Sequence, residues 1–414
     1  MIPQHQKLLS YPTQKAVMQF VKADLRIKLA IHSPSLSVVD RAVPLRIHCL
    51  VLDHNITQIN DTTYSLSTFR EYPDGSVVPL LHREDNDNGG LDFDLDPWGL
   101  RDPSLDGVLY PGDVRLHGAR NEADIDERKR ELEWEREILE DEVSYGIMNP
   151  EIFANLDRLK TELLPFQCRD SKTLPNFTPY LQCTISSSEG TKSWRLQPSL
   201  KLCHAIRMLR FKLLGNHESI SVKVLKIGMR RKVLRLPELI KFRVKELRIL
   251  GKFSTTLNDL APVIEPSSFP LEVLEAEFSK LEVHPDFLSV KALTVSNKST
   301  FFFIIDDFSK LPHRIVHLKY DVFSIERFVE LIENWTRTGK PIGTRFSFKI
   351  GHGTKIRELF RELSEELFES LQFDFEPKIE DYGMSIPISN SSVIRIFTHQ
   401  EGEGIILVFE VVQA

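Results

Sequence analysis

The sequence has few of the features that mark secreted, membrane-spanning or metal-binding proteins. Its 414 residues include four cysteines, and none of them lies in a Cys-x-x-Cys pair or in a Cys/His pattern with zinc-ligand spacing. No stretch reaches the roughly 18 consecutive apolar residues of a membrane-spanning helix. The first residues lack the basic start and apolar run of a secretory signal. These absences predict a protein of the cytoplasm, the nucleus or both, with no membrane partner.

Motifs of known enzymes are also missing. The sequence contains no Gly-rich phosphate loop, no Gly-x-Ser-x-Gly and no His-Glu-x-x-His. Residues 84–96 place carboxylates at alternate positions, as calcium loops do, but Gly89 stands where such a loop needs a ligand and Asp96 replaces its bidentate glutamate. We therefore predict no catalytic residue, no cofactor and no metal. An enzyme of unfamiliar type is an alternative, and it would need a deep pocket with converging polar groups.

Acidic and basic residues are unevenly distributed along the chain, although the net charge is a modest −6. Acidic residues dominate 84–96 and 122–142, whereas basic residues dominate 201–248. Proteins that bind single-stranded nucleic acid also need aromatic side chains for stacking, and Phe242 is the one aromatic residue within 222–250. The asymmetry therefore predicts two solvated surfaces that can face each other, and not a nucleic-acid site.

Five six-residue segments, here called the ladder, share apolar residues at their first, fourth and sixth positions. Their central residues are leucines spaced 22, 27, 19 and 25 residues apart, close to the roughly 20–29 residues of a leucine-rich repeat. The pattern predicts an α/β protein with an irregular, leucine-rich-repeat-like open sheet and flanking helices. The segments are 222–227, 244–249, 271–276, 290–295 and 315–320.

The position between the last two apolar residues of each ladder segment is a candidate protein-binding position. Successive side chains of a strand alternate between the two faces of the sheet, so these five side chains are expected to point away from the core. Adjacent repeats stack such side chains into a surface on which repeat proteins bind their partners. The alternative is a plain solvated face. The candidate residues are Lys226, Arg248, Glu275, Thr294 and Lys319.

The rest of the chain is divided by composition and periodicity. Ile125, Leu132 and Leu139 are seven residues apart in a highly charged stretch, which predicts a solvated helix with one docked apolar stripe. Pro165 and Pro175 favour a linker before the ladder domain. We predict a small helical segment at 1–44, a β meander with an acidic Gly/Asp loop at 45–118, a charged helix at 119–145, a linker at 146–177, and a leucine-rich-repeat-like α/β domain with a C-terminal α/β cap at 178–414.

The N-terminal helical segment has two interpretations. Repeat arrays need terminal caps that cover the exposed end of the sheet, and short helices serve this purpose. Alternatively, residues 8–43 form a degenerate F-box, a three-helix module that docks onto an adaptor of the cullin-type ubiquitin ligases. The candidate adaptor-docking residues are Val17, Phe20 and Leu25. The cap is the simpler interpretation, because short helical patterns match many folds.

Several stretches of the chain stand out together: 11–12, 49–52, 60–64, 88–96, 98–99, 111–113, the charged helix, 331–335 and 340–343. Together they resemble a nematode-expanded family of uncharacterised proteins that contain a domain of unknown function, similar in layout to nematode F-box-associated proteins. The resemblance implies a non-enzymatic interaction protein, and it assigns no residue to a known site. We therefore predict a protein–protein interaction module, with an F-box-like substrate-recognition subunit of a ubiquitin ligase as the alternative.

Overall fold

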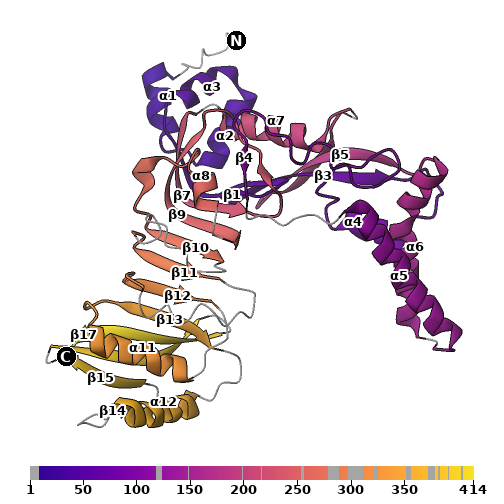
Figure 1. The fold of residues 1–414 in the computed structure, drawn as a ribbon. Helices are drawn as coiled ribbons and strands as arrows, with labels where there is room; N and C mark the ends of the chain where they lie inside the picture. The colour runs from indigo at the N-terminus through magenta and orange to yellow at the C-terminus, as the bar shows by residue number, and fades with distance from the viewer. Residues whose placement is uncertain are drawn as a thin grey trace. The chain divides into compact units, whose positions relative to one another are not determined.

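The chain forms a mixed α/β protein in a computed structural model (Figure 1). Two compact units make up the fold: unit 1 comprises residues 1–221 and 228–241, and unit 2 comprises residues 222–227 and 242–414. The predicted domain start at residue 178 is therefore wrong. The structure describes residues 9–117, 124–147, 149–197, 199–215, 217–252, 256–277, 289–296, 311–319, 325–350, 356–371, 378–380, 383–389, 391–401 and 404–414.

Unit 1 begins with three short helices, as the sequence predicts. Ser10 caps the first helix, since its Oγ accepts a hydrogen bond from the Thr13 backbone N–H at 3.4 Å. The helices share a small apolar core made by Met18, Val39 and Val43. The helices are α1 (Tyr11–Met18), α2 (Ala23–His32) and α3 (Pro34–Arg41).

An antiparallel sheet forms the body of unit 1, and its first three strands are the predicted meander. The fourth strand joins it through a long register with the third, from Thr63 opposite Ser186 to Glu71 opposite Thr178. This pairing explains why residues after 178 belong to unit 1. The strands pair in the order β1 (Leu45–Leu52), β2 (Ile56–Ile59), β3 (Thr62–Glu71), β5 (Thr178–Ser187) and β6 (Gly190–Arg195).

Helix α7 (Leu202–Leu214) covers part of this sheet. Its buried residues Leu202 and Ile206 pack in one cluster with Leu66 and Leu181. Nearby, β4 (Val114–Arg115) and β8 (Val233–Leu234) form a second, two-stranded sheet. Unit 1 therefore gathers segments that are more than a hundred residues apart in the sequence.

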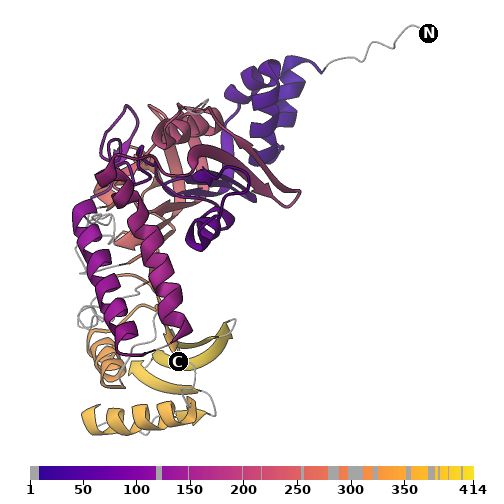
Figure 2. The same cartoon turned by 90° about the vertical axis from the view of Figure 1, so that its right-hand side faces the viewer.

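The segment predicted as a linker, 146–177, is instead largely helical. Helix α6 (Pro150–Ser171) packs along the charged helix α5 (Ile125–Ser144), and the two form a helical hairpin (Figure 2). Pro165 lies inside α6. A proline costs a helix about 3 kcal/mol, and here the burial of an apolar face at helical spacing offsets that cost. The shared core contains Leu100, Leu132, Leu159, Leu163 and Phe166, with Ile125 and Leu139 partly buried against it.

The acidic segment is only partly a loop. Helix α4 (Leu80–Asp87) occupies its beginning, and this helix was not predicted because its residues are mostly charged or polar. No helix among the described ranges combines the length and the apolar content that crossing a bilayer requires.

Unit 2 contains the ladder. Its strands lie side by side in sequence order, and the pairs from β9 to β13 are parallel. The five central leucines are all fully buried. The strands are β7 (Ser219–Gly228, of which 222–227 belong to unit 2), β9 (Lys241–Lys252), β10 (Val273–Glu277), β11 (Ala292–Val295), β12 (Ile315–Leu318) and β13 (Arg345–Ile350).

The register of β12 differs from the predicted alignment by two residues. Leu293 of β11 pairs with Val316, and Val295 pairs with Leu318. Both Val316 and Leu318 are buried, because residues two apart in a strand point to the same face. An apolar pattern of period two cannot distinguish these two registers. Tyr320, which ends the last predicted segment, lies outside the described residues.

The sheet of unit 2 continues with antiparallel strands and is packed by helices. Trp335 of α11 (Ile325–Thr338) stacks edge-on against Phe346 of β13, with ring centroids 4.9 Å apart. Within the region predicted as a C-terminal α/β cap, the strands β14 to β17 pair with one another as antiparallel neighbours in sequence order. The further elements are α8 (Thr256–Leu260), α12 (Ile356–Leu371), β14 (Lys378–Glu380), β15 (Gly383–Ser389), β16 (Ser392–Glu401) and β17 (Gly404–Gln413).

Truncation of a ladder leucine tests which face holds unit 2 together. We predict that Leu293→Ala lowers the free energy of unfolding by about 2–5 kcal/mol, because it leaves a cavity in a close-packed core. The matched control is Ile315→Ala on the neighbouring strand, whose side chain is 46% exposed and whose truncation should cost less than about 1 kcal/mol. Urea unfolding of the full chain measures both. Equal losses in the two variants would contradict this assignment of faces.

Candidate functional site

The outward side chains of the ladder strands form two straight rows across unit 2. In the first row, strand pairing places Arg248 opposite Glu275, Glu275 opposite Thr294, and Thr294 opposite His317. In the second row, Val273 lies opposite Ala292. We call the two rows together the ladder face. The first row is Arg248, Glu275, Thr294, His317 and Ser347, and the second row is Glu246, Val273, Ala292, Ile315 and Arg345.

Three of the five predicted binding residues, Arg248, Glu275 and Thr294, lie in the first row. Lys319 does not, because the shifted register puts His317 opposite Thr294. Its side chain nevertheless reaches back to the row, and Nζ lies 2.6 Å from Oε1 of Glu275. Lys226 is a half-buried residue of β7. The structure thus brings four of the five predicted residues together.

Glu275 is the centre of the charges on the ladder face. It pairs with Lys319 and, at 3.6 Å, with Nε of Arg248, whose guanidinium also lies 3.4 Å from Glu246. Pairs at a solvated surface contribute about 0–1 kcal/mol each. These pairs therefore orient the side chains of the face more than they stabilise unit 2.

The sequence analysis missed His317 and the apolar centre of the second row. The Nδ1 atom of His317 lies 2.5 Å from Oγ of the buried Ser347 on the next strand. Val273 and Ala292 are half-buried, and Ile315 beside them is exposed. An analysis of all outward positions two residues apart, and not one position per segment, would have found both rows.

The N-terminal helices expose all three candidate adaptor-docking residues. Phe20 is 87% exposed, and Val17 and Leu25 are also exposed. The helices keep their arrangement through a buried ion pair between Arg26 of α2 and Asp40 of α3. Arg26 also donates to the backbone oxygen of Pro44 at 2.9 Å. The apolar residues at the surface are thus held on a folded scaffold.

Asp40 accepts a second buried contact, from Nε2 of His217 at 2.9 Å. Burial raises the pKa of the Asp40 carboxyl, but the hydrogen bonds from His217 and Arg26 outweigh burial and the pKa is lowered overall. Because His217 follows α7, this contact ties the N-terminal helices to the body of unit 1.

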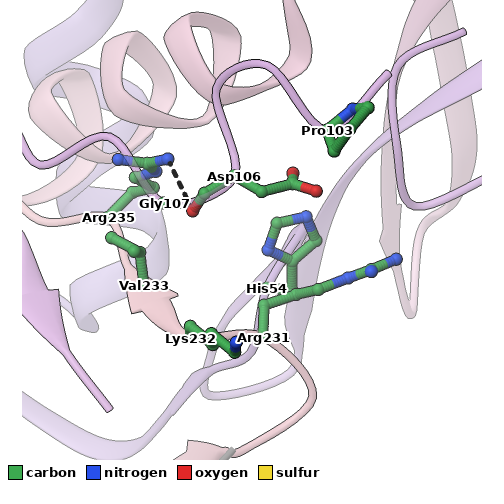
Figure 3. A pocket seen from close by; sticks show the side chains of 8 residues that line it. All are labelled: His54, Pro103, Asp106, Gly107, Arg231, Lys232, Val233 and Arg235. Carbon is green, nitrogen blue, oxygen red and sulfur yellow. Dashed lines mark hydrogen bonds between the residues drawn. The ribbon is translucent and has the colours of Figure 1, made fainter. Parts of the chain in front are cut away.

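A cavity of about 170 Å³ lies in unit 1, beside the turn between β1 and β2 (Figure 3). Arg235 holds one wall, since its Nη2 donates to the backbone oxygens of Leu105 at 2.6 Å and Asp106 at 3.5 Å. Its Nη1 pairs with the buried carboxylate of Asp113 at 2.7 Å. The lining residues are His54, Pro103, Asp106, Gly107, Arg231, Lys232, Val233 and Arg235.

His54 supplies a neutral imidazole to this cavity. Burial, followed by the positive charge of Arg231, lowers its pKa to about 4. A neutral imidazole accepts a hydrogen bond through one ring nitrogen, so the cavity can hold a water or a hydroxyl group.

The carboxylates of the acidic segment are used within the fold. Asp85 pairs with Arg70 at 2.6 Å, and Asp92 pairs with Arg231 at 2.7 Å. Asp94 accepts from the backbone N–H of Leu202, where α7 begins, at 2.9 Å. Asp96 closes a turn by accepting two backbone N–H groups. Among the described residues, no group of three His, Cys, Asp or Glu side chains is placed to hold a metal ion.

One ion pair joins the acidic segment 84–96 to the basic segment 201–248, and a second joins the basic segment to Asp102, outside the acidic segments. Arg231 pairs with Asp92, and Lys201 pairs with Asp102 at 2.7 Å. The basic segment therefore has protein partners for these charges.

Comparison with known proteins gives one family match. Residues 201–352 match a family described as Domain of unknown function (DUF3557). The match begins just before α7, ends just after β13, and contains the ladder face. No curated protein and no solved structure matches the chain.

The pKa of His54 leads to a pH prediction. The unfolded chain has an ordinary histidine pKa of about 6.5, so between about pH 6.5 and 4 the unfolded state binds more protons than the folded state. The contribution of His54 to stability should be fully present above about pH 6.5 and lost as the pH falls toward the folded value of about 4. The urea midpoint should therefore depend less on pH in His54→Asn than in the wild type.

The control for this measurement is His48→Asn, which makes the same substitution at an exposed histidine of β1. If His54→Asn and the wild type lose stability in parallel as the pH falls, His54 does not remain neutral in the folded chain.

Proposed function

We propose that this chain is a non-enzymatic protein-recognition module that binds a partner protein through the ladder face. The observation that supports the proposal is the composition of the ladder face. Its first row contains the charged residues Arg248 and Glu275, and its second row has an apolar centre beside them. The opposite face of the same strands is fully buried, so the ladder face is the side that can be offered to a partner.

The arrangement of the strands supports a leucine-rich-repeat-like interpretation. Parallel strands follow one another in sequence order, and each contributes one residue to each row. Repeat proteins use the surface made in this way for binding. The irregular spacing of 19 to 27 residues between successive ladder leucines means that the connections differ in length, and the rows stay straight despite this.

The composition of the ladder face favours recognition of a protein. An apolar centre such as Val273, Ala292 and Ile315 supplies contact area, and charged residues at its side supply orientation and selectivity. Glu275, Arg248 and Lys319 are already paired with one another. A partner can therefore exchange one surface ion pair for another without burying an unpaired charge, which would be costly.

The test of this function is recovery of partners from native cells by proximity labelling. We predict that Thr294→Arg/Ile315→Glu reduces recovery of the main partners at least about tenfold, because the added charges occupy the centre of the binding surface. Glu362→Lys, at an exposed position of α12 in the same unit, is the control and should keep the partners. Unchanged recovery with the ladder-face variant would contradict the proposal.

A second function is favoured by the exposed apolar residues of the N-terminal helices. We propose, as the alternative, that residues 8–43 act as an F-box-like module and that the chain is a substrate-recognition subunit of a cullin-type ubiquitin ligase. The support is the exposure of Val17 on α1, of Phe20 in the turn after α1, and of Leu25 on α2. Burial of a phenylalanine at an interface contributes about 1.5–3 kcal/mol, so an exposed Phe20 can anchor an adaptor.

The alternative has its own test. Phe20→Asp and Leu25→Asp should each abolish co-purification of the adaptor and the cullin, and the melting temperature should not change because both side chains are exposed. Phe211→Asp, at an exposed position of α7, is the control and should keep both proteins. If the wild-type chain recovers neither adaptor nor cullin, the alternative is rejected while the ladder-face proposal stands.

A further inference from the structure

Helix α5 and its C-cap residue Tyr145 expose a stripe of large apolar side chains on the side that faces away from the hairpin core. Trp134 is 66% exposed, Tyr145 is 84% exposed, and Ile138 between them is exposed as well. Spacings of four and seven residues place these side chains on one face of a helix. Leu132 on another face is buried in the hairpin core. The exposed residues are therefore additional to the docked stripe and do not hold the hairpin together.

Helix α12 of unit 2 provides a comparison, because it is also rich in glutamate. Its apolar residues Phe360, Leu363 and Leu367 are buried. These three large apolar side chains of α12 thus point inward, unlike Trp134 and Ile138 of α5. Exposed tryptophan and tyrosine are the residue types that most often dominate binding energy at protein interfaces, which makes the outward stripe of α5 a candidate interface.

The charge around this stripe is negative. Four of the six residues from 137 to 142 are acidic and none is basic. Earlier in α5, Glu133 and Glu135 are paired with Lys129 and Arg158. Within the described ranges, Glu137, Asp141 and Glu142 take part in no ion pair. The C-terminal half of α5 therefore carries negative charge that the fold itself does not neutralise.

We propose that the α5 stripe, which comprises Trp134, Ile138 and Tyr145 flanked by Glu137, Asp141 and Glu142, docks a basic amphipathic helix of a partner protein. The stripe runs for about 16 Å at 1.5 Å per residue, the length of roughly three turns of a helix. Apolar anchors of the partner would cover Trp134 and Ile138, and its lysine or arginine side chains would pair with the three carboxylates and lie over the aromatic rings.

The charge selects this occupant over others. A second copy of the chain would bring the same acidic side chains against one another, and like charges in contact are repulsive. Nucleic acid and anionic membranes are also negatively charged and are repelled by the same residues. A cationic helix with an apolar face satisfies both the aromatic stripe and the acidic flanks.

The test uses the full chain and a synthetic peptide as the probe. The peptide has 18 residues, with leucine at helical spacings of three and four and lysine at all other positions. We expect Trp134→Ser/Ile138→Ser to weaken peptide binding at least about tenfold, which corresponds to about 1.4 kcal/mol. Glu137→Gln/Asp141→Asn/Glu142→Gln should weaken it by a similar factor. Fluorescence anisotropy of the labelled peptide measures the dissociation constant.

Two controls separate the stripe from general attraction to acidic helices. Glu362→Gln/Glu366→Gln removes two exposed carboxylates from α12 and should leave peptide binding unchanged. A peptide of the same pattern with glutamate in place of lysine should not bind. The substituted side chains of α5 are exposed, or half-buried at Glu142, so the variants should keep the circular dichroism spectrum and melting temperature of the wild type.

Three results would overturn the proposal. One is equal weakening by the α12 variant, and another is binding of the glutamate peptide as tight as that of the lysine peptide. The third is self-association of the wild type in sedimentation velocity that Trp134→Ser abolishes, since this would assign the stripe to a second copy. Because the ladder face lies in unit 2, none of these results depends on the function proposed above.

Discussion

The rest of unit 2 depends on one constraint. Every second side chain of the ladder strands must be buried away from water. Leu247, Leu274 and Leu293 are fully buried, and full burial of a leucine contributes about 1.5–3 kcal/mol. The outward pairs around Glu275 contribute about 0–1 kcal/mol each. The sheet is therefore specified by its inner face, and substitutions on the outer face should change the free energy of unfolding little.

Unit 1 differs from unit 2 because it buries charged side chains. Arg210 is completely buried and donates to Thr57 Oγ1 at 3.0 Å and to the backbone oxygen of Arg235 at 2.8 Å. Burial lowers its pKa to about 10, so the guanidinium stays charged at neutral pH. Arg235 in turn pairs with Asp113. Removing one member of a buried pair leaves an uncompensated charge and costs about 3–5 kcal/mol, which makes these residues structural.

The sequence predicted the elements whose periodicity is local and missed those that depend on distant contacts. The pattern of apolar residues predicted the ladder strands and their buried leucines. It could not distinguish two possible pairings of β12 with β11, because Val316 and Leu318 are buried equally. Pro165 suggested a linker, whereas an apolar face packed on α5 stabilises the helix around it. Helix α4 is mostly polar and has little apolar periodicity to reveal it.

The candidate site was also predictable only in part. Arg248, Glu275 and Thr294 follow from one position per segment, because neighbouring strands stack equivalent residues. His317 and Ile315 lie two and four residues before Lys319, at outward positions that a choice of one position per segment leaves out. The exposed face of α5 also required the structure, since the heptad of Ile125, Leu132 and Leu139 identifies the buried side of the helix and says nothing of whether Trp134 is covered.

The two proposed surfaces differ in how their charges are satisfied, and this difference sets how each would recognise a partner. On the ladder face, Glu275 already has Arg248 and Lys319 as partners, so a bound protein replaces one ion pair by another and gains little net electrostatic energy. Affinity there must come from the apolar row, and the charges act on specificity. Along the C-terminal half of α5 the carboxylates of Glu137, Asp141 and Glu142 take part in no ion pair within the described ranges, so their field extends into solvent and attracts a cationic partner before contact. The ladder face is therefore suited to selecting a partner by shape and register, and the α5 stripe to capturing one by charge.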